Sequence, residues 1–131
     1  TDLGCGELVS EIVIPLLPPG TLYHFEKVSN RTTLDIAAVN SALRLTTAAD
    51  GSISDLRISA GGVSPVPMLL DGLGAMRGRK PTAETIDAIA KAAENAARPI
   101  DDIRGSAEYK KLLLGQLMRA HFAAFSAGKA I

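Results

Sequence analysis

The chain has 131 residues, the length of one average domain. It carries 14 Lys and Arg against 14 Asp and Glu, a balance that excludes the basic excess of nucleic-acid-binding proteins and a polybasic membrane anchor. A single Cys excludes an internal disulfide and a Cys-based metal site, and no apolar run approaches the ~20 residues of a membrane span.

Aromatic residues are scarce although the chain is rich in apolar ones. Hydrophobic residues make up 47% of the sequence, whereas aromatic residues make up 4% and Trp is absent. That apolar share is enough for a packed core. Nucleotide sites, however, often stack their ligand on aromatic rings. We therefore expect a packed domain that holds no complete ligand site alone and is not catalytic in isolation.

The first 20 residues are predicted to belong to a different unit from the rest. The chain begins Thr1-Asp2-Leu3-Gly4, without Met or a basic leader, which favours a fragment or a processed chain. The β-branched stretch 7–14 predicts a strand. Three prolines and a glycine within 15–20 predict a stiff connector. We place a domain boundary here: residues 1–20 are a trailing strand and connector, and residues 21–131 form a second domain.

Two strands are predicted after the connector. Residues 22–28 are typical of the first, and residues 33–47 of the second. The apolar alternation of 33–47 changes phase, which predicts either a bulge near 37–41 or a strand covered on both faces. A helix over 34–43 is the competing interpretation.

A hairpin is predicted to return the chain. Asp50-Gly51 is typical of a two-residue turn, because both residues tolerate positive φ. The returning strand covers residues 53–60 and ends at the two glycines that follow it. Residues 68–77 then predict a short helix that two internal glycines weaken.

Two clearer helices are predicted to complete the chain. Thr82 caps the first, which ends at Arg98-Pro99, and Ser106 caps the second, which runs to about Gly128 and has a wide apolar face. Strands come first and helices last, so we predict an α+β fold, a small antiparallel β-sheet packed on about three helices.

The sequence offers no set of residues for catalysis or metal binding. His24 and His121 lie on different elements without ligands at suitable spacing, so no metal site and no catalytic residue is predicted. We expect His24 to be a partly exposed strand residue and His121 to lie at the surface. Lys27 is expected at a strand edge, and Asp35 is expected to accept hydrogen bonds from loop amides near Arg31.

Five short motifs occur in a characteristic order. They are Glu7-Leu-Val-Ser-Glu-Ile-Val-Ile-Pro15, Phe25-Glu-Lys27, Asp35-Ile-Ala-Ala-Val39, Ala60-Gly-Gly-Val-Ser-Pro65 and Asp102-Ile-Arg-Gly-Ser-Ala-Glu-Tyr109. Over nearly the whole chain this order resembles the C-terminal part of the FAD-binding (medium) subunit of molybdenum hydroxylases, the family of the carbon monoxide and xanthine dehydrogenases.

The resemblance implies an oxidoreductase subunit that shares its work with other parts. FAD would be held by the intact subunit, through an upstream FAD-binding domain, and not retained by this chain. Molybdopterin and 2Fe-2S clusters would lie in two partner subunits, in a cytoplasmic enzyme. Lys27 would approach the isoalloxazine ring, and Leu8 and Val9 would pack against the flavin. The alternative is an independent α+β binding or regulatory module without catalysis.

Overall fold

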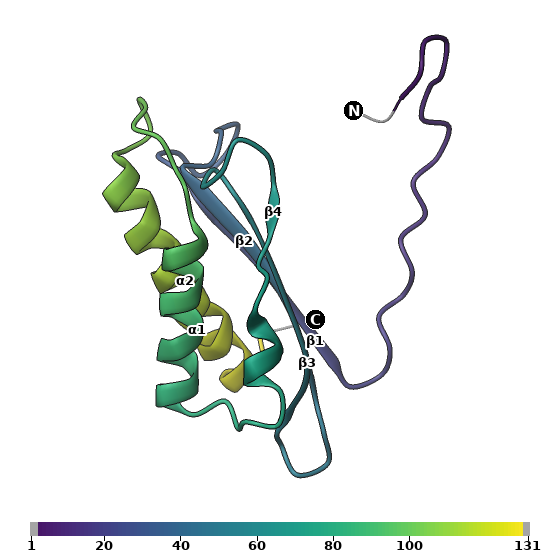
Figure 1. The fold of residues 1–131 in the computed structure, drawn as a ribbon, viewed down its shortest axis with the longest axis vertical. Coiled ribbons are helices and arrows are strands. Elements are labelled where there is room, and N and C mark those ends of the chain that lie inside the picture. The colour runs from purple at the N-terminus through teal and green to yellow at the C-terminus, as the bar shows by residue number, and fades with distance from the viewer. Residues whose placement is uncertain (1–2, 130–131) are drawn as a thin grey trace.

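Four strands follow one another in the sheet in chain order, each antiparallel to its neighbour. The computed structural model describes residues 3–129. The strands are β1 (Thr21–Val28), β2 (Val39–Thr47), β3 (Ile53–Gly61) and β4 (Met68–Leu69). A 3₁₀ turn, η1 (Leu73–Met76), leads to the helices α1 (Ala83–Ala96) and α2 (Ala107–Ser126), which lie side by side on one face of the sheet (Figure 1). The predicted α+β class is confirmed, with η1 in place of a third full helix.

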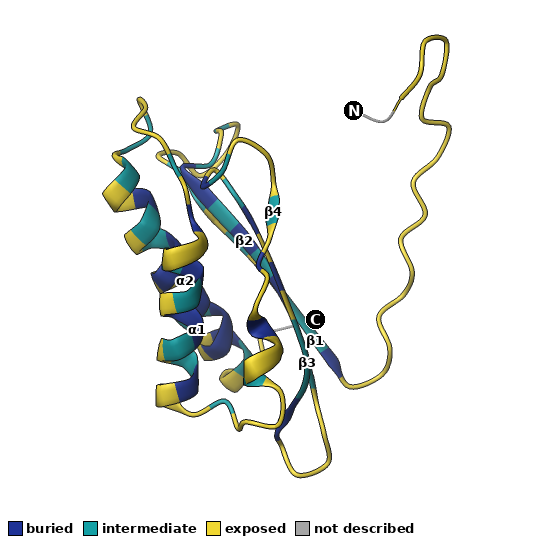
Figure 2. Ribbon diagram, in the orientation of Figure 1, coloured by how far each residue is buried: buried dark blue, intermediate teal, exposed yellow. Residues whose placement is uncertain are grey.

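The period-2 alternation of the strands separates a buried face of the sheet from an open one. Along β2 the side chains of Val39, Ser41, Leu43 and Leu45 are buried, whereas those between them are half-buried. The helices cover only the first set, so the other face of the sheet meets no element of the described chain (Figure 2). This arrangement is usual for an antiparallel sheet.

Both helices begin at the capping residues that the sequence predicts. The Thr82 hydroxyl accepts a hydrogen bond from the Thr85 N–H at 3.4 Å, and Ser106 accepts one from the Tyr109 N–H at 3.1 Å. Each cap satisfies an amide that the helix itself leaves unpaired. Three fully buried alanines, Ala90 and Ala93 on α1 and Ala97 directly after it, keep that helix close to its neighbours.

The strand predicted over 7–14 is not formed within the described chain, and as part of an upstream unit it stays a prediction. Residues 7–18 have no regular secondary structure and are exposed throughout, running away from the sheet as an extended segment (Figures 1 and 2). A β-rich sequence forms a strand only when a neighbour takes up its backbone hydrogen bonds, and none is present here. The domain boundary at 15–20 stays a prediction.

The second predicted strand starts later than expected. β2 begins at Val39, and residues 29–38 form a loop, so neither the helix over 34–43 nor the bulge near 37–41 is present. Leu34 and Ile36 are 94% and 69% exposed, which explains the apparent change of phase, because they precede the strand. The sheet register shifts instead between Thr46 and Thr47.

The two predicted local features around β3 also differ in detail. The turn after β2 holds three residues, because Gly51 N–H bonds Ala48 C=O at 2.9 Å and Ala48 N–H bonds Ser52 C=O at 2.8 Å. Of the two predicted turn residues, only Gly51 has positive φ. This is the type I turn with a following left-handed glycine. The helix predicted over 68–77 is replaced by β4 and η1, since Gly72 takes a left-handed conformation between them.

Gly62 occupies a position where the fold has no room for a side chain. Its φ is +81°, and a Cβ there would lie 2.4 Å from the Ala38 carbonyl oxygen. Gly51 has a similar φ of +80° but open space around it. Gly51→Ala should therefore cost about 1 kcal/mol of unfolding free energy from backbone strain alone, and Gly62→Ala roughly 3 kcal/mol because steric overlap is added. Urea unfolding of both variants measures the difference, and equal losses would contradict the close approach.

Candidate functional site

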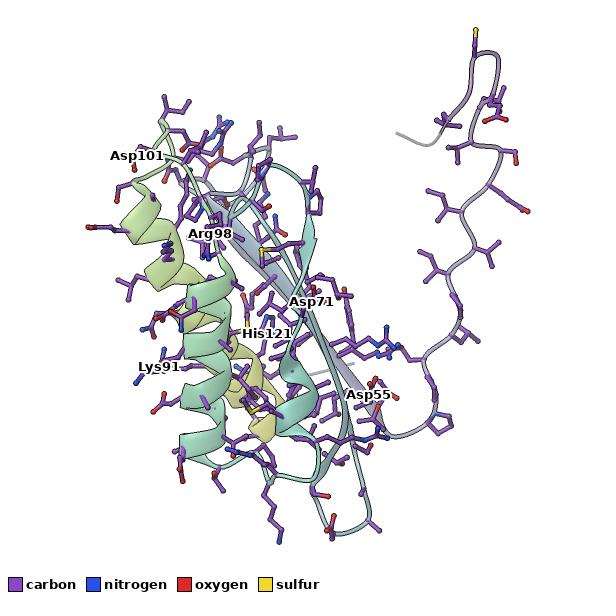
Figure 3. The ribbon with its side chains drawn as sticks, viewed as in Figure 1. Asp55, Asp71, Lys91, Arg98, Asp101 and His121 are labelled. Carbon is purple, nitrogen blue, oxygen red and sulfur yellow. The ribbon has the colours of Figure 1, made fainter. Side chains whose placement is uncertain are left out.

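The motifs converge at one end of the domain. The carboxyl ends of β1 and β3, the start of β2, the end of α1 and the start of α2 all meet there, at the top of Figure 1. Arg98 and Asp101, in the connection between the helices, mark this end in Figure 3. Four motifs far apart in the sequence thus share one surface, which we call the motif end. The fifth, in residues 7–15, lies outside it.

Lys27 closes a loop at the motif end. Its ammonium donates to the Asp35 carbonyl oxygen at 2.6 Å. The Arg31 N–H donates to the Asp35 carboxylate at 2.9 Å, which confirms the predicted role of Asp35. This backbone hydrogen bond lowers the pKa of the Asp35 carboxyl below its usual range. The Lys27 side chain itself is exposed, on the open face of the sheet together with Phe25.

Lys110 forms a second charged cluster beneath the same surface. Its side chain is 2% exposed, and its ammonium lies 2.9 Å from the Asp102 carboxylate and donates to the Ile100 carbonyl at 2.8 Å. The hydrogen bond from Lys110 lowers the pKa of Asp102. Sequence reasoning missed this residue. A signal was present, because Lys110 has the helical spacing that places it on the same face of α2 as Leu114 and Leu117.

A pocket of about 310 Å³ lies beside this ion pair, with Gly62 and Arg98 also in its wall. Its two cationic groups are already engaged. The Arg98 guanidinium donates to the Ala97 carbonyl at 2.8 Å, and Lys110 is paired with Asp102. The cluster therefore joins the helix connection to the start of α2, and both of its cationic groups already make hydrogen bonds within the domain. Arg104 adds to it, with its guanidinium 3.4 Å from the Asp102 carboxylate.

A chain of polar groups crosses the core between the sheet and α2. His24 Nδ1 and His121 Nδ1 are 2.9 Å apart, and His121 Nε2 lies 2.8 Å from the Ser41 hydroxyl. His121 is fully buried (Figure 3), so the predicted surface position is wrong, whereas His24 is partly exposed as expected. Sequence reasoning missed the contact because it joins residues 97 positions apart.

The neighbours of this chain fix its proton positions. Glu26 lies 3.5 Å from His24 Nε2 and favours a proton on that nitrogen, which leaves His24 Nδ1 as an acceptor. His121 then donates from Nδ1 and accepts from Ser41 at Nε2. In this arrangement His24, His121 and Ser41 each have a hydrogen-bond partner. Burial and the neighbouring His24 lower the pKa of His121 to about 4.

The residues expected near a flavin are not all brought together. Lys27 lies at the motif end, but Leu8 and Val9 are 77% and 63% exposed on the extended segment, which runs away from the sheet (Figure 1). Within residues 3–129, no group of three or more His, Cys, Asp or Glu is arranged to hold a metal ion. None of the helices described is long and apolar enough to cross a bilayer.

Comparison with known proteins gives consistent matches. Residues 24–125 match the family profile of the CO dehydrogenase flavoprotein C-terminal domain. The nicotine 6-hydroxylase medium subunit of Paenarthrobacter nicotinovorans is 34% identical over 121 residues, which cover 91% of this chain and 41% of that protein. The carbon monoxide dehydrogenase medium chain of Hydrogenophaga pseudoflava is 30% identical over 114 residues, covering 86% and 39%.

The likeness extends to three dimensions. A solved structure of carbon monoxide dehydrogenase from Hydrogenophaga pseudoflava matches with a TM-score of 0.79 and 28% identity, over 90% of this chain and 40% of that chain. The chain spans about two fifths of the length of the curated relatives it matches.

The low pKa of His121 predicts acid-dependent stability. Between pH 6.5 and 4 the His121 imidazole is protonated in the unfolded chain but neutral in the folded one. The free energy of unfolding therefore has its full value above pH 6.5 and falls as the pH drops toward 4. The loss should total roughly 3 kcal/mol from this residue. Urea unfolding at pH steps from 7 to 4 measures it. His121→Gln, which keeps a hydrogen-bonding group but cannot titrate, should have a flatter profile; an unchanged profile would contradict the assignment.

Proposed function

Because the chain belongs to the family of CO dehydrogenase flavoprotein C-terminal domains, we propose that it closes the flavin site of a medium subunit in a molybdopterin-dependent hydroxylase or dehydrogenase. The resemblance inferred from the order of the motifs is confirmed by the family match. The proposal concerns what this domain does in an intact subunit about two and a half times as long.

Lys27 is the observation on which the proposal depends. Its ammonium is exposed, yet a carbonyl 2.6 Å away holds it in place at the motif end. Phe25, two residues earlier, is 52% exposed on the same open face of the sheet. A fixed cation beside an exposed ring suits one edge of an isoalloxazine system, which is flat, apolar in its body and rich in acceptor atoms.

The domain supplies only that edge of the site. FAD, when bound, takes electrons from iron–sulfur clusters and passes them to an acceptor. A glycine-rich turn that opens a helix is a common site for the pyrophosphate of such a cofactor. Gly72 and Gly74 instead precede and occupy a four-residue 3₁₀ turn. We therefore assign the pyrophosphate to an upstream FAD-binding domain and the ring contact to Lys27.

The extended segment provides a natural joint with that upstream domain. Eight large apolar residues of the segment are exposed: Leu3, Leu8, Val9, Ile12, Val13, Ile14, Leu16 and Leu17. A run of this kind is stable only when another surface covers it. We propose that residues 7–14 complete a sheet of the upstream domain and that Leu8 and Val9 pack against the flavin there.

The remaining parts of the proposed enzyme lie in other subunits. A molybdopterin subunit carries out hydroxylation, and an iron–sulfur subunit with 2Fe-2S clusters delivers the electrons to FAD, in a cytoplasmic assembly. The medium subunit named for nicotine 6-hydroxylase supports this division, since it is one component of a larger enzyme.

The role of Lys27 can be tested on the flavin itself. A positive charge beside the ring favours its more negative, reduced form, so Lys27→Met in the full-length subunit should lower the flavin midpoint potential. Spectroelectrochemical titration measures the shift. Lys91→Met is the matched control, because Lys91 lies exposed on α1, the helical side of the domain (Figure 3). A potential and flavin spectrum unchanged by Lys27→Met would rule out the contact.

The division of the site between domains can be tested on this chain alone. Purified as the 131-residue polypeptide, it should be colourless and take up no stoichiometric FAD, because within residues 3–129 no glycine-rich turn opens either of the two α-helices. Absorbance near the flavin bands after incubation with FAD and gel filtration measures retention. Tight one-to-one binding would show that the domain holds the cofactor unaided.

A further inference from the structure

The ammonium of Lys27 is held by its own loop. A lysine on an exposed sheet face has four rotatable bonds and a strongly hydrated head, so by itself it defines no fixed position. Here the head group makes a short, charge-assisted hydrogen bond of 2.6 Å to the Asp35 carbonyl oxygen. The place of the charge is therefore set by the place of that carbonyl.

Arg31 and Asp35 fix the carbonyl by closing the loop on itself. The Asp35 carboxylate accepts from the Arg31 N–H at 2.9 Å and lies 3.8 Å from its guanidinium. The same guanidinium donates to the Leu34 carbonyl at 2.8 Å. That carbonyl directly precedes, along the chain, the Asp35 carbonyl that accepts from Lys27. These contacts join Arg31 to Leu34 and Asp35 and so close the middle of the loop.

The backbone of the loop is strained at Leu34, as expected if the contacts of Arg31 and Asp35 hold its conformation. Leu34 has φ of +50°, the only positive value at a non-glycine residue in the described chain, and its side chain is 94% exposed. A leucine gains nothing from that backbone conformation by itself. The base of the loop is fixed separately, by the Ala38 N–H bond to the Val28 carbonyl at 2.8 Å. The strain therefore falls between Arg31 and Asp35.

We propose that Arg31 and Asp35 are positioning residues for Lys27, and that their closed loop sets where its positive charge stands against the flavin. This inference rests on the proposed flavin contact of Lys27. One ammonium N–H is used by the loop carbonyl, which leaves the other two free to face a ligand. Opening the loop would leave the charge present but no longer fixed.

The test is a double-mutant cycle on the flavin midpoint potential of the full-length, FAD-loaded subunit. Asp35→Ala frees the ammonium, which lowers the potential, and removes a negative charge, which raises it. In a subunit that already carries Lys27→Met only the charge effect remains, so Asp35→Ala should shift the potential upward relative to its effect in the subunit that keeps Lys27. Arg31→Gln is the milder second variant, since it removes the guanidinium and keeps the backbone N–H that bonds Asp35.

The outcomes separate this inference from the proposed function. If Lys27→Met lowers the potential while the shifts from Asp35→Ala and Arg31→Gln are the same with and without Lys27, the positioning role is overturned and the flavin contact stands. If Lys27→Met itself has no effect, the flavin contact fails and the inference fails with it. Retained FAD absorbance confirms that each variant is folded.

Discussion

The packing of α2 across β1 and β2 is the contact on which the rest of the domain depends. It buries Leu114, Met118 and Phe122 against the alternating apolar residues of β2, and burial of such side chains is the main source of stability for a domain of this size. The polar contact of His121 with His24 and Ser41 fixes the helix to both strands at one register. Because β1 and β2 also frame the loop 29–38, the geometry of the motif end follows from this packing.

The alternation of side chains along β1 decides which of its residues lie on the open face of the sheet. Residues 22, 24, 26 and 28 face α2, which places Tyr23, Phe25 and Lys27 on the opposite, open face. A shift by one residue would bury the lysine and expose His24. The position of the charge at the motif end is therefore a consequence of which face the helices cover.

Local signals in the sequence were enough for most elements, and contacts between distant residues were not predictable. The caps at Thr82 and Ser106 and the alternation in β1 and β3 are read within a few residues, and the structure agrees with them. The environment of His121 depends on a residue 97 positions away. The start of β2 was misjudged because Leu34 and Ile36 are apolar yet exposed. The candidate site came from the order of motifs and not from any one residue, since Lys27 alone is an ordinary strand lysine.

The exposed apolar segment before β1 has a consequence for how the subunit is made. In the proposed subunit, residues 7–14 leave the ribosome as the last piece of the upstream domain, immediately before the first strand of this one. Domains generally complete folding in the order of synthesis. The connector predicted over 15–20 would then separate two folding events in that subunit, and the meander that follows pairs only neighbouring strands, a topology of short sequence separations. In the proposed subunit, residues 7–14 would therefore be covered by the upstream domain before the domain that begins at β1 has folded.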